Sequence, residues 1–211
     1  MEPFEGRHSY EPRLGHGLPH DPFNAIVAPR PIGWIGTRSA KGVRNIAPYS
    51  FFNALAYKPP TIGFASQNAK DSLRNVEETG VFTWNLATRR LAERMNATSA
   101  EVGGDIDEFE MAGLAAVDGR LVDAPLVAES PVTFECRKSM IVQLKTADGA
   151  AMPNWLVIGE VVAVHIDRTF LKDGLYDTAS ARPITRGGGP ADYFEITPEA
   201  LFKLRRPVAA R

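Results

Sequence analysis

The sequence predicts a mainly β protein with short helices, built as an antiparallel barrel or sandwich. Three observations support this class. Apolar residues alternate with other residues in several short segments, which is typical of strands. Glycines and prolines, 18 and 16 in number, separate these segments and mark turns. No strand–helix–strand unit repeats along the chain, which argues against a doubly wound parallel sheet.

The composition narrows the class of protein further. The chain has 211 residues, with 24 Lys and Arg against 25 Asp and Glu, and its net charge is −1. This balance disfavours a nucleic-acid partner. The length favours one domain, at 23–211, preceded by an extended arm at 1–22. The lone Cys136 excludes a disulfide within the chain, and four scattered histidines predict no metal site.

The location of the protein is also an expectation from the sequence. No apolar run approaches the roughly 20 residues that a membrane-spanning helix needs. Residues 1–13 lack the apolar stretch of a secretory signal. We therefore expect no membrane partner and a soluble, cytoplasmic protein.

The first half of the domain is expected to begin with strands. Residues 24–28 are a short strand candidate, and 32–37 and 43–50 form a hairpin around a turn at 39–42. Residues 51–56 are apolar and are interpreted as irregular.

Two strand–helix steps follow. Strands are predicted at 61–66 and 81–86. Asp71 is a suitable N-cap for a helix at 72–79 that ends at Gly80. Thr88 is expected to cap a second helix at 89–98. Acidic residues and glycines at 101–110 predict a mobile surface loop.

The second half is expected to consist mostly of strands. Residues 131–136 and 140–145 are interpreted as two partner strands. Residues 155–165 form the longest apolar run, which predicts a central strand buried on both faces and bent at Gly159. Thr197 and Pro198 open a short helix.

Seven residues, 66–72, form the strongest candidate for an anion site. They connect a predicted strand to a helix N-terminus, where free amide groups and the helix dipole favour a phosphate. Lys70 adds a positive charge, and Ser66 and Ser72 add hydroxyl donors. The alternative is a plain capping turn in which Asp71 fills the site. The sequence contains neither of the glycine-rich phosphate motifs of dinucleotide-binding domains and P-loops.

A second candidate site lies at 45–53, where polar residues interrupt an apolar strand. Asn45, Ser50 and Asn53 have the donors and acceptors to bind the edge of a heteroaromatic ring, and Phe51 the surface to cover its face. The alternative is that the aromatic residues belong to the core and the polar groups satisfy backbone at a strand end.

Isolated residues carry weaker signals. His165 ends the longest strand, where Glu160 and Asp167 are candidates to orient it, and Tyr193 follows a triple glycine. Each of these two residues has an ordinary structural interpretation as well. Cys136 is interpreted as a small core residue.

Five segments taken together resemble the flavin reductase-like family, which includes flavoredoxin and the reductase components of two-component flavin monooxygenases. They appear in order at 30–37, 45–52, 70–75, 81–86 and 159–165. The resemblance covers roughly residues 23–194. It implies an FMN-binding, Greek-key split β-barrel that acts as a homodimer, with flavin sites near the interface.

The resemblance also implies roles for individual residues. Ser66, Lys70 and Ser72 match a phosphate-binding turn, and Asn45, Ser50 and Phe51 match positions that line the isoalloxazine. His165 and Tyr193 match catalytic positions on the exposed side of the flavin, where a nicotinamide or a substrate stacks. One position departs from the family pattern, because Glu108 stands where relatives often carry a lysine near the flavin.

The implied function is an FMN oxidoreductase that passes electrons from NADH or NADPH to flavin or to another acceptor, with a monooxygenase or a redox protein as partner. The alternatives are a flavoredoxin-like electron carrier reduced by a protein, and a non-redox flavin-binding dimer. Glu108 bears on this choice, because a carboxylate there disfavours the flavin phosphate or the phosphates of a nicotinamide dinucleotide, and it argues against NAD(P)H reductase activity more than against FMN binding.

Overall fold

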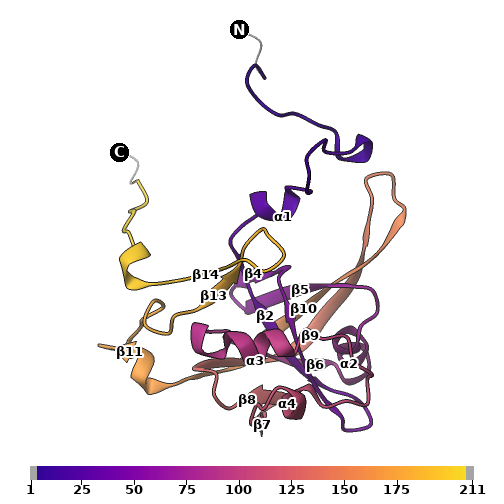
Figure 1. Ribbon diagram of the computed structural model, residues 1–211. Helices are drawn as coiled ribbons and strands as arrows, with labels where there is room; N and C mark the ends of the chain where they lie inside the picture. Colours follow the sequence, from indigo (N-terminus) through magenta and orange to yellow (C-terminus); the bar gives the residue numbers. More distant parts are fainter. Residues whose placement is uncertain (1–3, 208–211) are drawn as a thin grey trace.

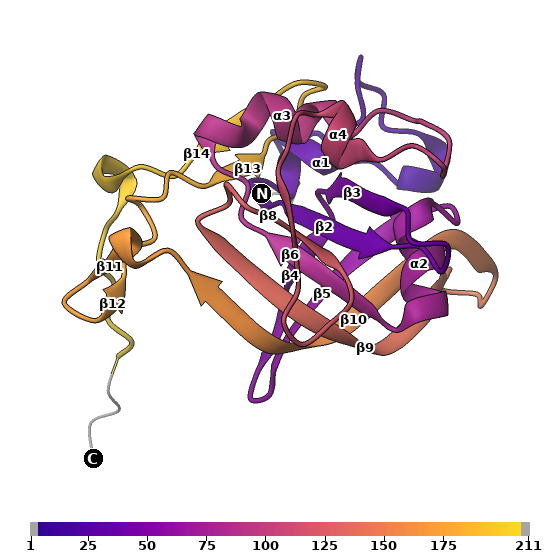
Figure 2. The same ribbon diagram turned by 90° about the horizontal axis from the view of Figure 1, so that it is seen from below.

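A seven-stranded antiparallel sheet forms the centre of the molecule and curls around its own core (Figures 1 and 2). The computed structural model describes residues 4–207. In spatial order the strands are β3 (Arg44–Tyr49), β2 (Gly33–Arg38), β6 (Val81–Asn85), β9 (Val132–Lys145), β10 (Ala151–Ile166), β5 (Pro60–Gln67) and β4 (Phe52–Tyr57). The predicted antiparallel, mainly β class is confirmed, because every strand pair in the described residues is antiparallel.

Smaller elements surround this sheet. Three short sheets pair β1 (Arg30–Pro31) with β13 (Ile184–Arg186) and β14 (Tyr193–Glu195), β7 (Ala116–Asp118) with β8 (Pro125–Val127), and β11 (Leu171–Lys172) with β12 (Leu175–Tyr176). The helices are α1 (Phe23–Ile26), α2 (Asp71–Thr79), α3 (Ala92–Ala97) and α4 (Glu108–Met111), with 3-10 turns η1 (Pro12–Leu14), η2 (Arg89–Leu91), η3 (Arg168–Phe170) and η4 (Pro198–Ala200). No helix among residues 4–207 is long and apolar enough to cross a membrane.

Two apolar clusters hold these layers together. Inside the curled sheet, the fully buried rings of Phe64 and Phe82 meet edge to face with centroids 5.6 Å apart. The second cluster lies between the sheet and the short helices, and contains Trp34, Met95 and Phe109. Burying each such side chain contributes about 1.5–3 kcal/mol. The cores therefore fix α3 and α4 against one side of the sheet.

Several expectations about the strands are wrong in an instructive way. Residues 24–26 belong to α1 rather than to a strand, because the Asp21 carboxylate accepts from the Phe23 amide (2.9 Å) and stabilises a turn. The segment expected to be irregular is β4, which pairs with β5 across a tight turn. The two strands expected at 131–145 are the single strand β9. Its partner β10 pairs with it along the whole length. Arg137 and Lys138 pair with Glu160 and Gly159, and the register shift between Ile158 and Gly159 leaves only Ser139 without a partner.

The expected longest strand is confirmed as β10, with a register shift at Gly159. The expectation that both of its faces are buried is wrong, because Trp155 and Ile158 are only half-buried and Val164 is 51% exposed. The β9–β10 hairpin extends beyond the rest of the sheet (Figure 1).

Of the two longer predicted helices, the structure contains the first as one helix and divides the second. The helix ending at Gly80 is confirmed as α2, and Gly80 has the positive φ (75°) that favours glycine there. The helix expected at 89–98 is divided into η2 and α3, and the Thr88 side chain makes no capping hydrogen bond. The loop expected at 101–110 ends in α4, whose Phe109 is fully buried.

The expected arm is mostly exposed at 4–22 and extends away from the sheet (Figure 1). Its first three residues, and with them the start of the segment examined for a secretory signal, lie outside the described residues.

Candidate functional site

A pocket of about 580 Å³ opens at the N-terminus of α2, and we call it the α2 pocket. Three predicted site residues, Asn45, Lys70 and Ser72, line it together. The remaining lining residues come from β3, from the start of α2, from the segment that follows α3 and from α4: Ala47, Pro48, Tyr49, Ala69, Asp71, Arg74, Thr98, Ser99, Ala100, Glu101, Val102, Gly104 and Glu108.

A buried hydrogen-bond network fixes one wall of this pocket. The Asn45 side-chain amide donates to Thr37 Oγ1 and to Ser72 Oγ, at 3.0 Å each. Asn75 donates to the same Thr37 oxygen at 3.0 Å. All four side chains are buried. Asn45 therefore positions the Ser72 hydroxyl at the first turn of α2.

The first turn of α2 has the features of an anion site. Lys70 rather than Asp71 is its N-cap, and no side chain caps the turn, so its first amide groups remain available to a ligand. The expectation that Asp71 caps the helix is wrong, because its carboxylate pairs with Arg74 one turn later. Lys70 Nζ lies 3.4 Å from Glu101 Oε1 at the exposed rim. Two cations therefore flank the amide groups.

Two polar groups of the pocket were not among the predicted binding residues: Tyr49 lies within the candidate segment 45–53, and Glu108 was noted only as a departure from the family pattern. Tyr49 is 9% exposed and Glu108 is 5% exposed, and the Tyr49 hydroxyl and the Glu108 Oε2 have no hydrogen-bond partner. Burial raises the pKa of both side chains, and for Tyr49 the nearby hydroxyls of Ser72 and Ser66 partly offset this shift. Thr98 and Ser99 were also missed, although a polar run after a predicted helix was a signal for them. An unpartnered buried polar atom is costly unless a ligand satisfies it.

Ser66 belongs to the same turn but does not line the pocket. Its hydroxyl donates to the carbonyl of Asn68 (3.0 Å), and the residue is fully buried. The structure thus gives Ser66 a hydrogen bond that holds the backbone of the turn before α2.

The other predicted binding residues line a separate cleft of about 490 Å³. Ser50, Phe51 and Asn53 lie there with Arg30, whose guanidinium carbon is 5.7 Å from the centre of the Phe51 ring. Asn53 Oδ1 accepts from the Ala54 amide. Consecutive residues at the end of β3 therefore line the two cavities in turn, with 47–49 at the α2 pocket and 50–53 at this second cleft.

The two predicted catalytic residues lie away from both cavities. His165 borders a cleft of about 320 Å³, and its Nε2 lies 2.7 Å from Glu135 Oε1. The residue that orients it is thus Glu135 of β9, rather than Glu160 or Asp167 as expected. Tyr193 stands on β14 with the Arg186 guanidinium carbon 4.9 Å from its ring centre. Within the described chain, nothing brings His165 and Tyr193 to the α2 pocket.

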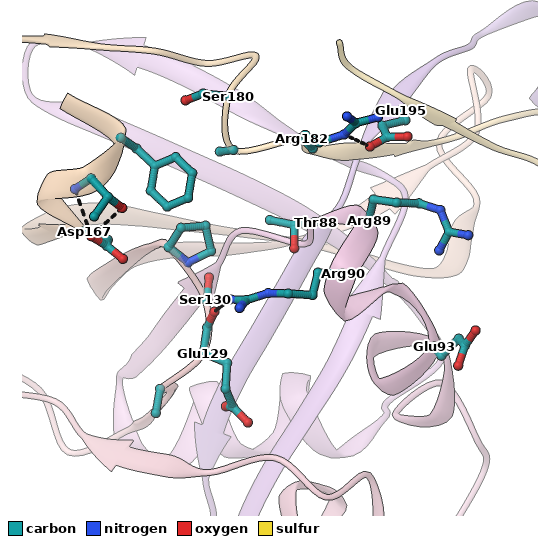
Figure 3. A pocket seen from close by; sticks show the side chains of 15 residues that line it. Thr88, Arg89, Arg90, Glu93, Glu129, Ser130, Asp167, Ser180, Arg182 and Glu195 are labelled. Carbon is teal, nitrogen blue, oxygen red and sulfur yellow. Dashed lines mark hydrogen bonds and ion pairs between the residues drawn. The ribbon is translucent and has the colours of Figure 1, made fainter. Parts of the chain in front are cut away.

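A larger cleft of about 950 Å³ is lined by η2, by residues 128–131 and by the segments around Asp167 and Arg182 (Figure 3). Most of its charged groups bind one another or nearby groups, whereas Arg89 and Glu93 make no side-chain ion pair or hydrogen bond in the described residues. Arg182 pairs with Glu195, the Asp167 carboxylate accepts from the Thr169 amide (2.9 Å), and Arg90 donates to the Glu129 carbonyl (3.2 Å). No predicted site residue lines this cleft. The α2 pocket is therefore the better candidate site.

Comparisons with known proteins agree with this architecture. The model of the flavin reductase like domain matches residues 27–185. A protein of Aquifex aeolicus (strain VF5) is 34% identical over 170 residues, which cover 78% of this chain and 83% of that protein.

Two solved structures are also similar. Nitrilotriacetate monooxygenase component B from Bacillus cereus has a TM-score of 0.82 and 28% identity, over 93% of this chain and 98% of that one. Flavoredoxin of Desulfovibrio vulgaris (Miyazaki F) has a TM-score of 0.73 and 25% identity, over 85% and 91%. With the curled antiparallel sheet and its α2 pocket, these matches show that the chain belongs to the flavin reductase-like family and has its split β-barrel fold.

Proposed function

We propose that the protein binds FMN and acts as an oxidoreductase that passes electrons from NADH or NADPH to flavin or to another acceptor. The observation that carries this proposal is the uncapped first turn of α2. Its amide groups lie in the same pocket as the side chains of Lys70, Ser72 and Arg74. Amide groups at a helix N-terminus with adjacent cations are a donor set suited to a phosphate. This favours a phosphorylated flavin over riboflavin.

The donor set of the α2 pocket fits the phosphate end of FMN. Lys70, Ser72 and the first amides of α2 would hold the phosphate, and Asn45 would hold the Ser72 hydroxyl in place. Ser50, Phe51 and Asn53, which follow directly in the chain, are proposed to contact the ring. When bound, the flavin supplies the hydride and electron transfer, while the protein supplies binding and orientation.

A homodimer is part of this proposal. Apolar side chains remain exposed on β4, β9 and β10, among them Leu55 (49%), Tyr57 (85%) and Met140 (54%). Exposed apolar surface of this kind is typical of an interface. His165 and Tyr193 lie away from the α2 pocket, so a second copy of the chain is the proposed means by which they reach a flavin.

A flavoredoxin-like carrier, reduced by a protein partner, is the second candidate. The α2 pocket contains the carboxylates of Asp71 and Glu101 besides its two cations. These carboxyl groups disfavour the additional phosphates of a nicotinamide dinucleotide, which supports reduction by a protein.

The test is to measure FMN binding and reduction. Lys70→Ala and Ser72→Ala are each expected to raise the Kd for FMN by about tenfold, because each removes a hydrogen bond to a charged group worth about 1.5–3 kcal/mol. Lys172→Ala, at an exposed lysine of β11, is the matched control. Unchanged affinity in both pocket variants would contradict the assignment of the phosphate site.

Anaerobic absorbance of the FMN complex then separates the two candidates. Bleaching of the flavin band by NADH or NADPH supports the oxidoreductase. A bound flavin that stays oxidised with both nucleotides, but is reduced by a ferredoxin-type donor, supports the carrier.

A further inference from the structure

Glu108 is a buried carboxyl group that the fold leaves without a hydrogen-bond partner at one oxygen. It is the first residue of α4, is 5% exposed, and lines the α2 pocket. Its Oε2 is one of four such atoms in the described residues, and the Tyr49 hydroxyl in the same pocket is another. An unpartnered carboxyl oxygen beside a cavity indicates a group that a ligand satisfies.

The charges around Glu108 do not neutralise it. Asp107, the N-cap of α4, and Glu110 within α4 both pair with Arg44 of β3, at 2.6 and 3.0 Å. Across the pocket, Arg74 pairs with Asp71 and Lys70 pairs with Glu101. Each nearby cation therefore already faces a carboxylate in the described structure, and no ion pair of the described residues includes Glu108.

The protonation of Glu108 follows from this environment. Burial raises its pKa, its own amide and that of Ile46 partly offset this, and the charge of Asp107 raises it further. A protonated carboxyl group is a hydrogen-bond donor, whereas a carboxylate only accepts. Beside an anionic ligand, the donor form is the favourable one.

We infer that Glu108 is a phosphate-recognition residue of the α2 pocket, whose protonated carboxyl group donates a hydrogen bond to the FMN phosphate. The inference rests on the proposed function. Bound phosphate and ionised Glu108 repel each other, so FMN binding takes up a proton at this residue. Affinity is highest below the pKa of Glu108 in the free protein, and declines as the pH rises through it.

The experiment compares the wild type with Glu108→Gln, which keeps a donor but does not ionise. The Kd for FMN is measured by flavin fluorescence between about pH 5 and about pH 9. The second ionisation of the phosphate, near pH 6, affects both proteins and cancels in the ratio of their Kd values. Glu110→Gln, on the same helix but outside the pocket, is the matched control.

For FMN, we expect the ratio of the wild-type Kd to the Glu108→Gln Kd to be near one at low pH and to rise about tenfold at high pH. A tenfold change corresponds to a rise of about one unit in the pKa of Glu108 when FMN binds. With riboflavin, which has no phosphate, the ratio is expected to stay constant. In weakly buffered solution, FMN binding takes up more protons in the wild type than in Glu108→Gln.

A ratio for FMN that does not change with pH overturns the inference and leaves the proposed function intact. The same pH-dependent ratio with riboflavin also overturns it, because Glu108 then acts on another part of the flavin. A wild-type protein that binds no FMN overturns the proposed function itself. If Glu108→Gln does not fold, the wild-type pH profiles for FMN and riboflavin are compared instead. Profiles that are equal, or that differ only by the phosphate ionisation near pH 6, overturn the inference.

Discussion

The substitution Glu135→Gln tests how much one buried carboxylate stabilises the fold. Glu135 is fully buried on β9, and it accepts hydrogen bonds from the amides of Arg120 (3.0 Å), Leu121 (2.6 Å) and Val122 (2.9 Å) and from His165 (2.7 Å). It therefore joins the loop before β8 to the centre of the sheet and to His165. Glutamine has nearly the same shape but carries no charge.

The magnitude follows from these four contacts. The glutamine carbonyl can replace Oε2 and keep the Leu121 and Val122 amides as neutral hydrogen bonds. Its NH₂ group then faces the Arg120 amide, so one part-buried donor loses its acceptor, which costs about 1–3 kcal/mol. Loss of charge weakens the remaining bonds by about another 1 kcal/mol. We expect a total loss of about 3 kcal/mol in the free energy of unfolding.

The pH dependence gives a second signature. Burial alone disfavours the ionised form of Glu135, but the hydrogen bonds from Leu121, His165, Arg120 and Val122 outweigh it and lower its pKa. A lowered pKa contributes stability above the unfolded-state value, about 4.3, which is lost as the pH falls through the folded-state value. The difference between the wild type and Glu135→Gln is therefore expected to shrink in acid.

The assay is urea unfolding at about pH 7 and about pH 3.5, followed by tryptophan fluorescence. Glu160→Gln is the control, because this exposed glutamate lies on the neighbouring strand β10. A loss of less than about 0.5 kcal/mol for Glu135→Gln at neutral pH, the range of ordinary surface substitutions, would refute the reasoning.

Two further predictions concern the core of the sheet. Gly159→Ala places a methyl group 2.4 Å from the fully buried Phe82 ring and 3.1 Å from the Arg137 carbonyl. In urea unfolding it is expected to lower the free energy of unfolding by about 1–3 kcal/mol. A loss below about 0.5 kcal/mol would contradict the packing argument. Burial raises the pKa of Cys136, so its thiol is expected to react with a disulfide reagent only on unfolding, and rapid labelling of the native protein would show that the strand opens.

Local patterns predicted the strands whose alternation is clear. The interpretation of 32–37 and 81–86 places β2 and β6 to within one residue at every end, and Gly80 marks the end of α2. The continuity of β9 was not predictable locally. Polar residues at 137–139 look like a turn, and only pairing with β10 keeps them in the strand.

The candidate site was predictable to the same extent. The pattern of a strand followed by a helix N-terminus predicted that Lys70 and Ser72 share one site, and both line the α2 pocket. Asn45 reaches the same pocket because the β2–β3 hairpin places it there. Glu108 was expected in a surface loop. Its burial depends on the docking of α4 on β3, which local sequence does not reveal.

The hydrogen bond between Trp34 Nε1 and Thr98 Oγ1 (3.0 Å) joins the second apolar core to the wall of the α2 pocket. Thr98 in turn donates to the carbonyl of Met95 (2.7 Å), which lies in that same core. The wall is thus part of the folding unit and not an appended loop. Transplanting only residues 66–72 and 98–104 into another barrel would move the ligand-facing atoms without the indole that holds them, so the site and its core have to be transferred together.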